Sequence, residues 1–164
     1  MGPGATGDDV PSDTSLIDDA RAARRASRTF AARLARVPEI SRFVEAFCAA
    51  HDVGRDDTLR MTLVVEELVA NTIAHGHRGE CDAPIVVSLH AAAEGVELSY
   101  EDTAPRFDLE AALDQARIRP DDPDPASRPV GGLGLPLIAQ YAGCVRYVYE
   151  QGRNRVSLRL RHST

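Results

Sequence analysis

Three polar side chains recur at every fourth position near the end of a long apolar stretch: Glu67, Asn71 and His75. On a helix with about 3.6 residues per turn, this spacing places them on one face. Mg²⁺ prefers oxygen ligands such as carboxylates and carboxamides, and a carboxylate beside the cation can accept a proton from a hydroxyl group. The stretch therefore fits a magnesium-dependent reaction centre. It equally fits a solvated helix face on which His75 caps the C-terminus.

Two later segments could contribute to the same chemistry. Asp102 ends a run typical of a strand, where its carboxylate could accept a hydrogen bond from an exocyclic amine such as that of adenine, although aspartate is also an ordinary turn residue. Gly131, Gly132 and Gly134 precede a predicted helix, whose free N–H groups and positive dipole end favour phosphate. Each signal is weak alone. The order of metal ligand, base acceptor and phosphate turn in one short chain favours a nucleotide site.

The composition excludes several classes of protein. The chain has 164 residues and no lysine, since all 19 basic residues are arginine. A P-loop and an ordinary protein kinase both need a lysine on the phosphates, so both are excluded. The net charge of -6 argues against general binding of nucleic acid.

The chain also shows no sign of a membrane or secreted protein. No apolar run approaches the roughly 18 residues of a membrane span, and the first residues do not resemble a signal peptide. Cys48, Cys81 and Cys144 form no C-x-x-C pair. We therefore expect a cytoplasmic protein with buried, reduced thiols.

The hydrophobic pattern predicts one domain at 15–164 behind a disordered tail at 1–14. The order of elements indicates an α/β (α+β) two-layer sandwich, with helices packed on a mixed, mainly antiparallel sheet. Four prolines in the segment 118–130 predict a mobile loop at about 117–131, placed to act as a lid. The predicted strands are 28–34, 84–91, 95–102, 144–151 and 154–160, and the predicted helices are 38–53, 56–76, 108–117 and 131–143.

The three segments resemble the motifs of a known ATPase superfamily. "EELVANTIAHGH" (66–77) is similar to the N-box, "EDTAPRFD" (101–108) to the G1-box and "GGLGLPLI" (131–138) to the G2-box of the GHKL ATPases. That superfamily includes gyrase, the heat-shock chaperone ATPase, histidine kinases and the MutL proteins. The local pattern resembles its small stand-alone branch, the anti-sigma factor serine/threonine kinases of the RsbW and SpoIIAB type. The resemblance covers about residues 27 to 161 and implies the GHKL (Bergerat) ATP-binding fold, with helices on one face of the sheet.

The resemblance implies ATP and Mg²⁺ as cofactors and gives the N-box residues their roles. Glu67 would be the catalytic base that activates a serine or threonine hydroxyl, and Asn71 would bind the Mg²⁺ ion. His75 would complete the N-box as a structural residue. Glu66 is turned about 100° away on a helix, so it is left outside the site.

The other two boxes would bind the nucleotide. Asp102 would hold the adenine amine, with Ala104 and Phe107 beside it. The family usually carries glycine at the position of Ala104, and alanine resists positive φ. The turn is therefore expected to differ from the family's, or nucleotide binding to be weaker. In the G2-box the nucleotide contacts would be Gly132, Leu133, Gly134 and Leu135.

The function implied by the resemblance is partner switching by a protein serine/threonine kinase. Such a protein binds a sigma factor or another regulatory target and phosphorylates a small STAS-domain antagonist. The phosphate adds roughly -1.5 to -2 charges and disrupts docking. The stand-alone relatives also imply a homodimer.

Three alternatives remain. The protein could bind nucleotide as a ligand and sequester a partner without phosphoryl transfer, which Ala104 keeps open. It could be the catalytic piece of a histidine kinase, although the region before residue 27 is too short for a two-helix phosphoacceptor domain. It could also be a regulatory domain that binds no nucleotide.

Overall fold

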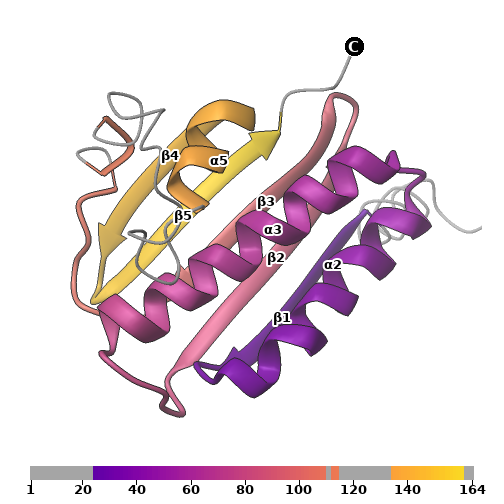
Figure 1. Ribbon diagram of the computed structural model, residues 1–164. Helices are drawn as coiled ribbons and strands as arrows, with labels where there is room; N and C mark the ends of the chain where they lie inside the picture. The colour runs from indigo at the N-terminus through magenta and orange to yellow at the C-terminus, as the bar shows by residue number, and fades with distance from the viewer. Residues whose placement is uncertain (1–23, 110–111, 115–133, 161–164) are drawn as a thin grey trace, which may run out of the picture.

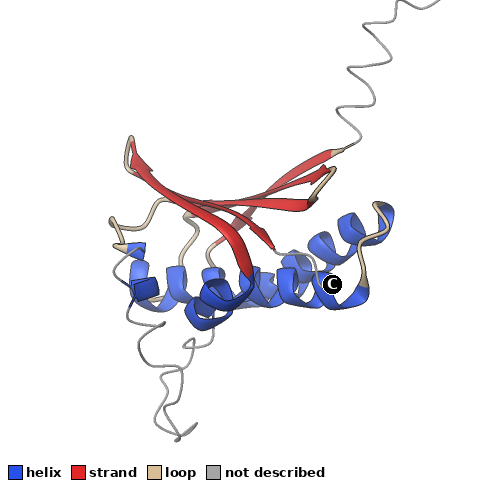
Figure 2. Cartoon of the chain, turned by 90° about the horizontal axis from the view of Figure 1, so that it is seen from above, coloured by secondary structure: helices blue, strands red, loops and turns tan. Residues whose placement is uncertain are grey.

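The computed structural model describes residues 24–109, 112–114 and 134–160. These residues form two layers, a single sheet and a set of helices packed against it (Figure 1). Seen from above, the described helices lie together on one face of the sheet (Figure 2). The predicted two-layer α/β arrangement is confirmed, and each pair of neighbouring strands is antiparallel.

The sheet has five strands in the order β1-β2-β3-β5-β4, which places β5 between β3 and β4. The strand bounds are β1 Arg25–Ala31, β2 Pro84–Ala92, β3 Gly95–Asp102, β4 Ala142–Glu150 and β5 Arg153–Leu160. The helix bounds are α2 Val37–Ala50, α3 Arg55–Asn71 and α5 Gly134–Tyr141. A 3₁₀ turn at Leu34–Arg36 precedes α2, and a π-helical turn at Thr72–Gly76 follows α3.

The helix layer is held by apolar residues at helical spacing. Pro38 lies in the first turn of α2, and Asp56 and Asp57 lie in the first turn of α3, where the helix dipole favours them. Each fully buried aliphatic side chain contributes about 1.5–3 kcal/mol, so the apolar stripes fix both helices on the sheet. The buried hydrophobic residues of these helices are Ile40, Val44, Phe47, Cys48, Met61, Val64, Val65, Leu68 and Val69.

Several predicted boundaries differ from those of the structure, and two of them have a clear local cause. The first strand ends at Ala31, because Leu34 begins the 3₁₀ turn and donates its N–H to the Glu80 carboxylate at 2.6 Å. The closing hairpin turns at Gln151 and Gly152, whose φ values of 51° and 73° suit a tight two-residue turn. Asn154, expected beside the turn, consequently lies inside β5.

The cysteines differ in exposure. Cys48 is buried as predicted, whereas Cys81 is half-buried and Cys144 is exposed on β4. The expectation of three buried thiols was therefore wrong for Cys144, which faces away from the helix layer.

Some predictions concern residues outside the described part of the chain. They are the tail at 1–14, the loop at about 117–131, Gly132 and Leu133. In the predicted helix 108–117, Leu109 and residues 112–114 are helical. No helix within the described residues is long and apolar enough to span a membrane.

Candidate functional site

The end of α3 carries the two polar residues of the first motif. Glu67 and Asn71 lie one turn apart in regular α-helix, and both are half-buried. The π-helical turn then begins at Thr72 and changes the angle between successive residues. His75 lies within this π-helical turn and is exposed. Glu67 and Asn71 therefore keep the predicted spacing of one α-helical turn, and the alignment of His75 with them stays a prediction.

The two neighbouring glutamates have different surroundings. Glu66 accepts a hydrogen bond from the Ser41 hydroxyl of α2 at 2.5 Å. In contrast, the Oε2 atom of Glu67 is buried and has no hydrogen-bond partner among the described residues. Leaving a buried polar atom unpaired costs about 1–3 kcal/mol, and more for a charged group. Native proteins keep few such atoms, so Glu67 is the better candidate for a chemical role.

Asp102, at the end of β3, is 6% exposed and accepts three hydrogen bonds. Its Oδ2 atom accepts from the Thr72 hydroxyl at 2.7 Å. Its Oδ1 atom accepts from the Asn154 amide at 2.8 Å and from the Ala104 N–H at 2.9 Å. The contact with Thr72 brings the N-box segment and the G1-box segment together in space, although 30 positions separate them in the chain. Because a carboxylate oxygen can accept two hydrogen bonds, Asp102 Oδ2 can accept one more besides that from Thr72.

Tyr100 also contacts Thr72 and thereby supports the hydrogen bond between Thr72 and Asp102. Its side chain is 1% exposed, and its hydroxyl lies 2.8 Å from Thr72 Oγ1 and 3.3 Å from the Leu68 carbonyl. Complete burial raises the pKa of Tyr100 well above its usual value, and the charge of Asp102 adds to that effect while the Thr72 hydrogen bond opposes it. Tyr100 therefore stays a neutral donor that ties the last turn of α3 to β3.

Ala104 fits the turn without strain. It is 3% exposed and is absent from the described non-glycine residues with positive φ, which are Asp52, Arg78 and Gln151. Ala104 therefore adopts this turn without a positive φ, and the expected difference from the family's turn, or weaker nucleotide binding, stays a prediction. A side-chain carbon built on Gly76 would lie 2.6 Å from the Ala104 Cβ atom. Glycine at 76 thus makes the room that the alanine methyl occupies.

The other predicted nucleotide contacts lie in different surroundings. Phe107 is 45% exposed, and its backbone N–H is directed at Tyr147 and Asn154. Gly134 is the first residue of α5, and Leu135 packs partly buried against the core. α5 lies beside α3, with the Arg60 guanidinium 4.5 Å from the centre of the Tyr141 ring.

The predictions from sequence missed Asn154. It is 5% exposed near the start of β5 and donates hydrogen bonds to Asp102 and to the turn that follows it. One signal pointed to it. Asparagine is depleted in strands, so an asparagine within an alternating run such as "NRVSLRL" is unusual.

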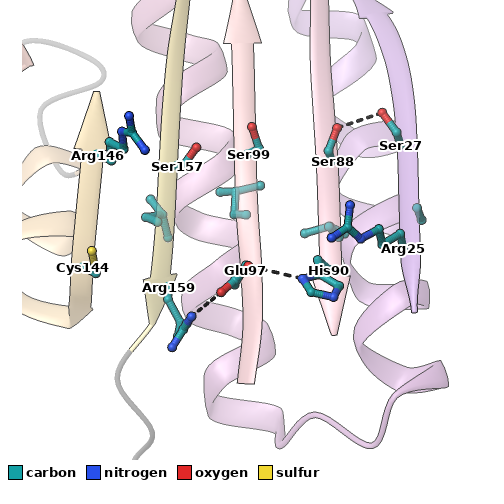
Figure 3. Close-up of a pocket in the computed structure, with 14 residues that line it drawn as sticks. Arg25, Ser27, Ser88, His90, Glu97, Ser99, Cys144, Arg146, Ser157 and Arg159 are labelled. Atoms are coloured by element: carbon teal, nitrogen blue, oxygen red, sulfur yellow. Dashed lines mark hydrogen bonds and ion pairs between the residues drawn. The ribbon is translucent and has the colours of Figure 1, made fainter. Parts of the chain in front are cut away.

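The opposite face of the sheet is polar and separate from this site. It carries a shallow hollow of about 730 Å³ (Figure 3). A row of four serines crosses the strands there, namely Ser27, Ser88, Ser99 and Ser157. Beside the row, Glu97 pairs with Arg159 and with His90. Asp102 and Asn154 point to the helix side, so the hollow is not part of their site.

The fold agrees with the class to which the chain belongs: it is a member of the histidine kinase-like ATPase domain family, whose pattern matches residues 30–160. Among individual proteins, it is 29% identical over 92 residues to the serine-protein kinase RsbW of Listeria innocua serovar 6a. It is 28% identical over 92 residues to the serine-protein kinase RsbW of Listeria monocytogenes serotype 4a. Each match covers 56% of this chain and 59% of the relative, so the chain spans about three-fifths of the relatives' length.

Proposed function

We propose that this protein is an ATP-dependent protein serine/threonine kinase that acts as an anti-sigma-type regulator by partner switching. Its substrate would be a STAS-domain antagonist, and its second partner a sigma factor or another regulatory target. The proposal includes a homodimer in the cytoplasm. It is supported by membership of the ATPase domain family and by the similarity to proteins named serine-protein kinase. The observation that carries it is the buried, unpartnered Oε2 atom of Glu67 one helical turn from Asn71.

The residues at the end of α3 suit ATP and Mg²⁺. Within the described residues, no three His, Cys, Asp or Glu side chains form a group that could hold a metal. A Mg²⁺ ion here would therefore bind the Asn71 side-chain oxygen, with phosphate oxygens and waters as its other ligands, as is usual for this cation. When bound, the ion would neutralise charge that develops on the phosphates.

The remaining roles fall to the protein's own groups. Glu67 would accept the proton of the attacking serine or threonine hydroxyl through its free Oε2 atom. The Asp102 carboxylate would accept a hydrogen bond from the adenine amine at Oδ2. The Thr72 hydroxyl uses one of the two acceptor positions of this oxygen, which leaves the other for the amine. Most of the rate would come from positioning, because phosphoryl transfer needs little covalent help from the protein.

The first test separates binding from transfer. A fluorescent ATP analogue is titrated into the wild type, Asn71→Ala, Glu67→Ala and Glu66→Ala, with and without Mg²⁺. We expect Asn71→Ala to lose the Mg²⁺-dependent part of binding and Glu67→Ala to keep it. Glu66→Ala is the matched control, because it removes the adjacent carboxylate, which is bonded to Ser41.

The second test follows labelled phosphate from ATP to a STAS-domain antagonist. We expect Glu67→Ala to slow transfer by about 10²–10⁴-fold, the usual contribution of a general base, and Glu66→Ala to leave it near the wild-type rate. Unchanged ATP affinity in Asn71→Ala would show that the site is misplaced. Tight binding without transfer in the wild type would instead favour a module that binds nucleotide and sequesters its partner.

A further inference from the structure

The side chain of Asn154 lies at the centre of a buried hydrogen-bond network. It projects from β5 to the helix side of the sheet, and the neighbouring strands place Asp102 opposite it on β3 and Tyr149 opposite it on β4. Its Nδ2 atom donates to Asp102 Oδ1 at 2.8 Å, to the Ala104 carbonyl at 2.9 Å and to the Pro105 carbonyl at 3.3 Å. These contacts tie one side chain to both the carboxylate and the backbone of the following turn.

The oxygen of the same amide completes the network. Asn154 Oδ1 accepts from the Tyr147 hydroxyl at 2.7 Å and from the Phe107 N–H at 3.4 Å. The amide therefore uses its donors on one side and its acceptor positions on the other. If the amide were flipped, its oxygen would face the Asp102 carboxylate and the carbonyls of Ala104 and Pro105, which have no proton to donate. The hydrogen bonds therefore require the orientation observed. Other side-chain types of this size lack such a combination of donors and acceptor.

We infer that Asn154 is a positioning residue for nucleotide recognition, because it holds the Asp102 carboxylate and the turn 103–107 in one arrangement. The inference rests on the proposed function, in which Asp102 accepts the amine of an adenine nucleotide. Asn154 acts through Asp102 and need not contact the nucleotide itself. Without it, Oδ1 would lose a donor and the carbonyls of Ala104 and Pro105 would lose their shared partner.

The test exchanges the amide for a carboxyl group in Asn154→Asp. Two carboxyl groups within hydrogen-bond distance cannot both ionise easily, so the pair shares a proton at low pH and loses it as the pH rises. In its protonated form, the introduced carboxyl group still donates to Asp102, whereas its ionised form repels Asp102. Tyr147 is a further titratable group in contact with position 154, and Tyr100 reaches Asp102 through Thr72.

Affinity for a fluorescent ATP analogue with Mg²⁺ is measured between pH 5.5 and 8.5. We expect Asn154→Asp to bind within about tenfold of wild type at pH 5.5 and to lose at least a further tenfold by pH 8.5, relative to the wild type at each pH. Ser157→Asp is the matched control, since it adds the same charge to the open face of the same strand. It should follow the wild-type profile. A merely structural role for Asn154 predicts weaker binding with no change in pH profile, and that result would overturn the inference.

If Asn154→Asp does not fold, a second variant and a second measurement still test the inference. Asn154→Leu keeps the same branched arrangement of heavy atoms and removes every polar contact. In the nucleotide-free protein, hydrogen exchange at the Ala104 and Phe107 amides should accelerate at least tenfold, while exchange in β2 stays unchanged. If the wild type binds ATP and Asn154→Leu binds equally well, the inference fails and the proposed function stands. If the wild type binds no nucleotide at any pH, the proposed function fails and the inferred role fails with it, and the exchange data then report only whether the turn is clamped.

Discussion

Replacing Gly76 by alanine would drive a new methyl group into Ala104. The added Cβ atom would lie 2.6 Å from the Ala104 Cβ atom, and neither carbon is the mobile end of a long side chain. Overpacking of this kind costs about 1–3 kcal/mol. Alanine recovers about 0.5–1 kcal/mol of that, because glycine is the less favourable residue within a helical turn. We expect Gly76→Ala to lower the free energy of unfolding by about 1–2 kcal/mol.

The reciprocal change supplies the other half of a double-mutant cycle. Ala104→Gly removes a buried methyl group worth about 0.8 kcal/mol and adds about 0.5–1 kcal/mol of backbone entropy, so it should cost about 1–2 kcal/mol. The double variant Gly76→Ala with Ala104→Gly exchanges the two residues, so that one methyl group again fills the space between positions 76 and 104. It should lie within about 1 kcal/mol of wild type, although independent effects would sum to about 2–4 kcal/mol.

Urea unfolding of the four proteins measures this coupling. Gly54→Ala is the control, because a Cβ atom at Gly54 meets nothing within 4 Å and the residue has a φ of -57°. Gly54 is also the N-cap of α3, where alanine is less favourable than glycine, so we expect Gly54→Ala to lower the stability by less than about 1 kcal/mol and to show no coupling with Ala104→Gly. The reasoning would be refuted if Gly76→Ala were as stable as wild type, or if the two losses simply added in the double variant.

Further expectations follow from Tyr100 and Glu97. Tyr100→Phe should cost about 0.5–1.5 kcal/mol in urea unfolding, because Thr72 Oγ1 and the Leu68 carbonyl each keep another hydrogen-bond contact; a loss above about 3 kcal/mol would contradict this assignment. Since burial raises the pKa of Tyr100, absorbance titration should show this phenol ionising only as the protein unfolds, and stability should fall as the pH rises above about 10. Hydrogen bonds from Arg159 and His90 lower the pKa of Glu97 in the folded protein. The ionised Glu97 carboxylate should therefore stabilise the fold above about pH 4.3, the usual pKa of glutamate, and this stabilisation should be lost as the pH falls through the lower pKa of the folded state. Glu97→Gln should accordingly make the unfolding midpoint less sensitive to pH between about 5 and 3, and an unchanged slope would argue against that effect.

Local pattern was sufficient for most of the fold. Alternating residues in 84–91 and 95–102 predicted β2 and β3 nearly to the residue, because one face of each strand is buried against the helices. Helical spacing of apolar residues likewise predicted α2 and α3. The order of the three motifs along the chain also came from the sequence, and membership of the ATPase domain family agrees with it.

Only the tertiary structure decided which of those residues meet. Helical periodicity predicted that Glu66 and Glu67 point in different directions. The hydrogen bond between Ser41 and Glu66, and the lack of a described partner for Glu67 Oε2, depend on how α2 packs against α3. The fit of Ala104 against Gly76 depends on how closely the β3 turn approaches the end of α3.

Asn154 shows the physical reason most clearly. Its partners Asp102 and Ala104 lie about 50 positions earlier in the chain, and they reach it only because β5 inserts between β3 and β4 in one register. A local pattern reports which face of an element is apolar, whereas the sheet register decides which polar groups are within hydrogen-bond distance.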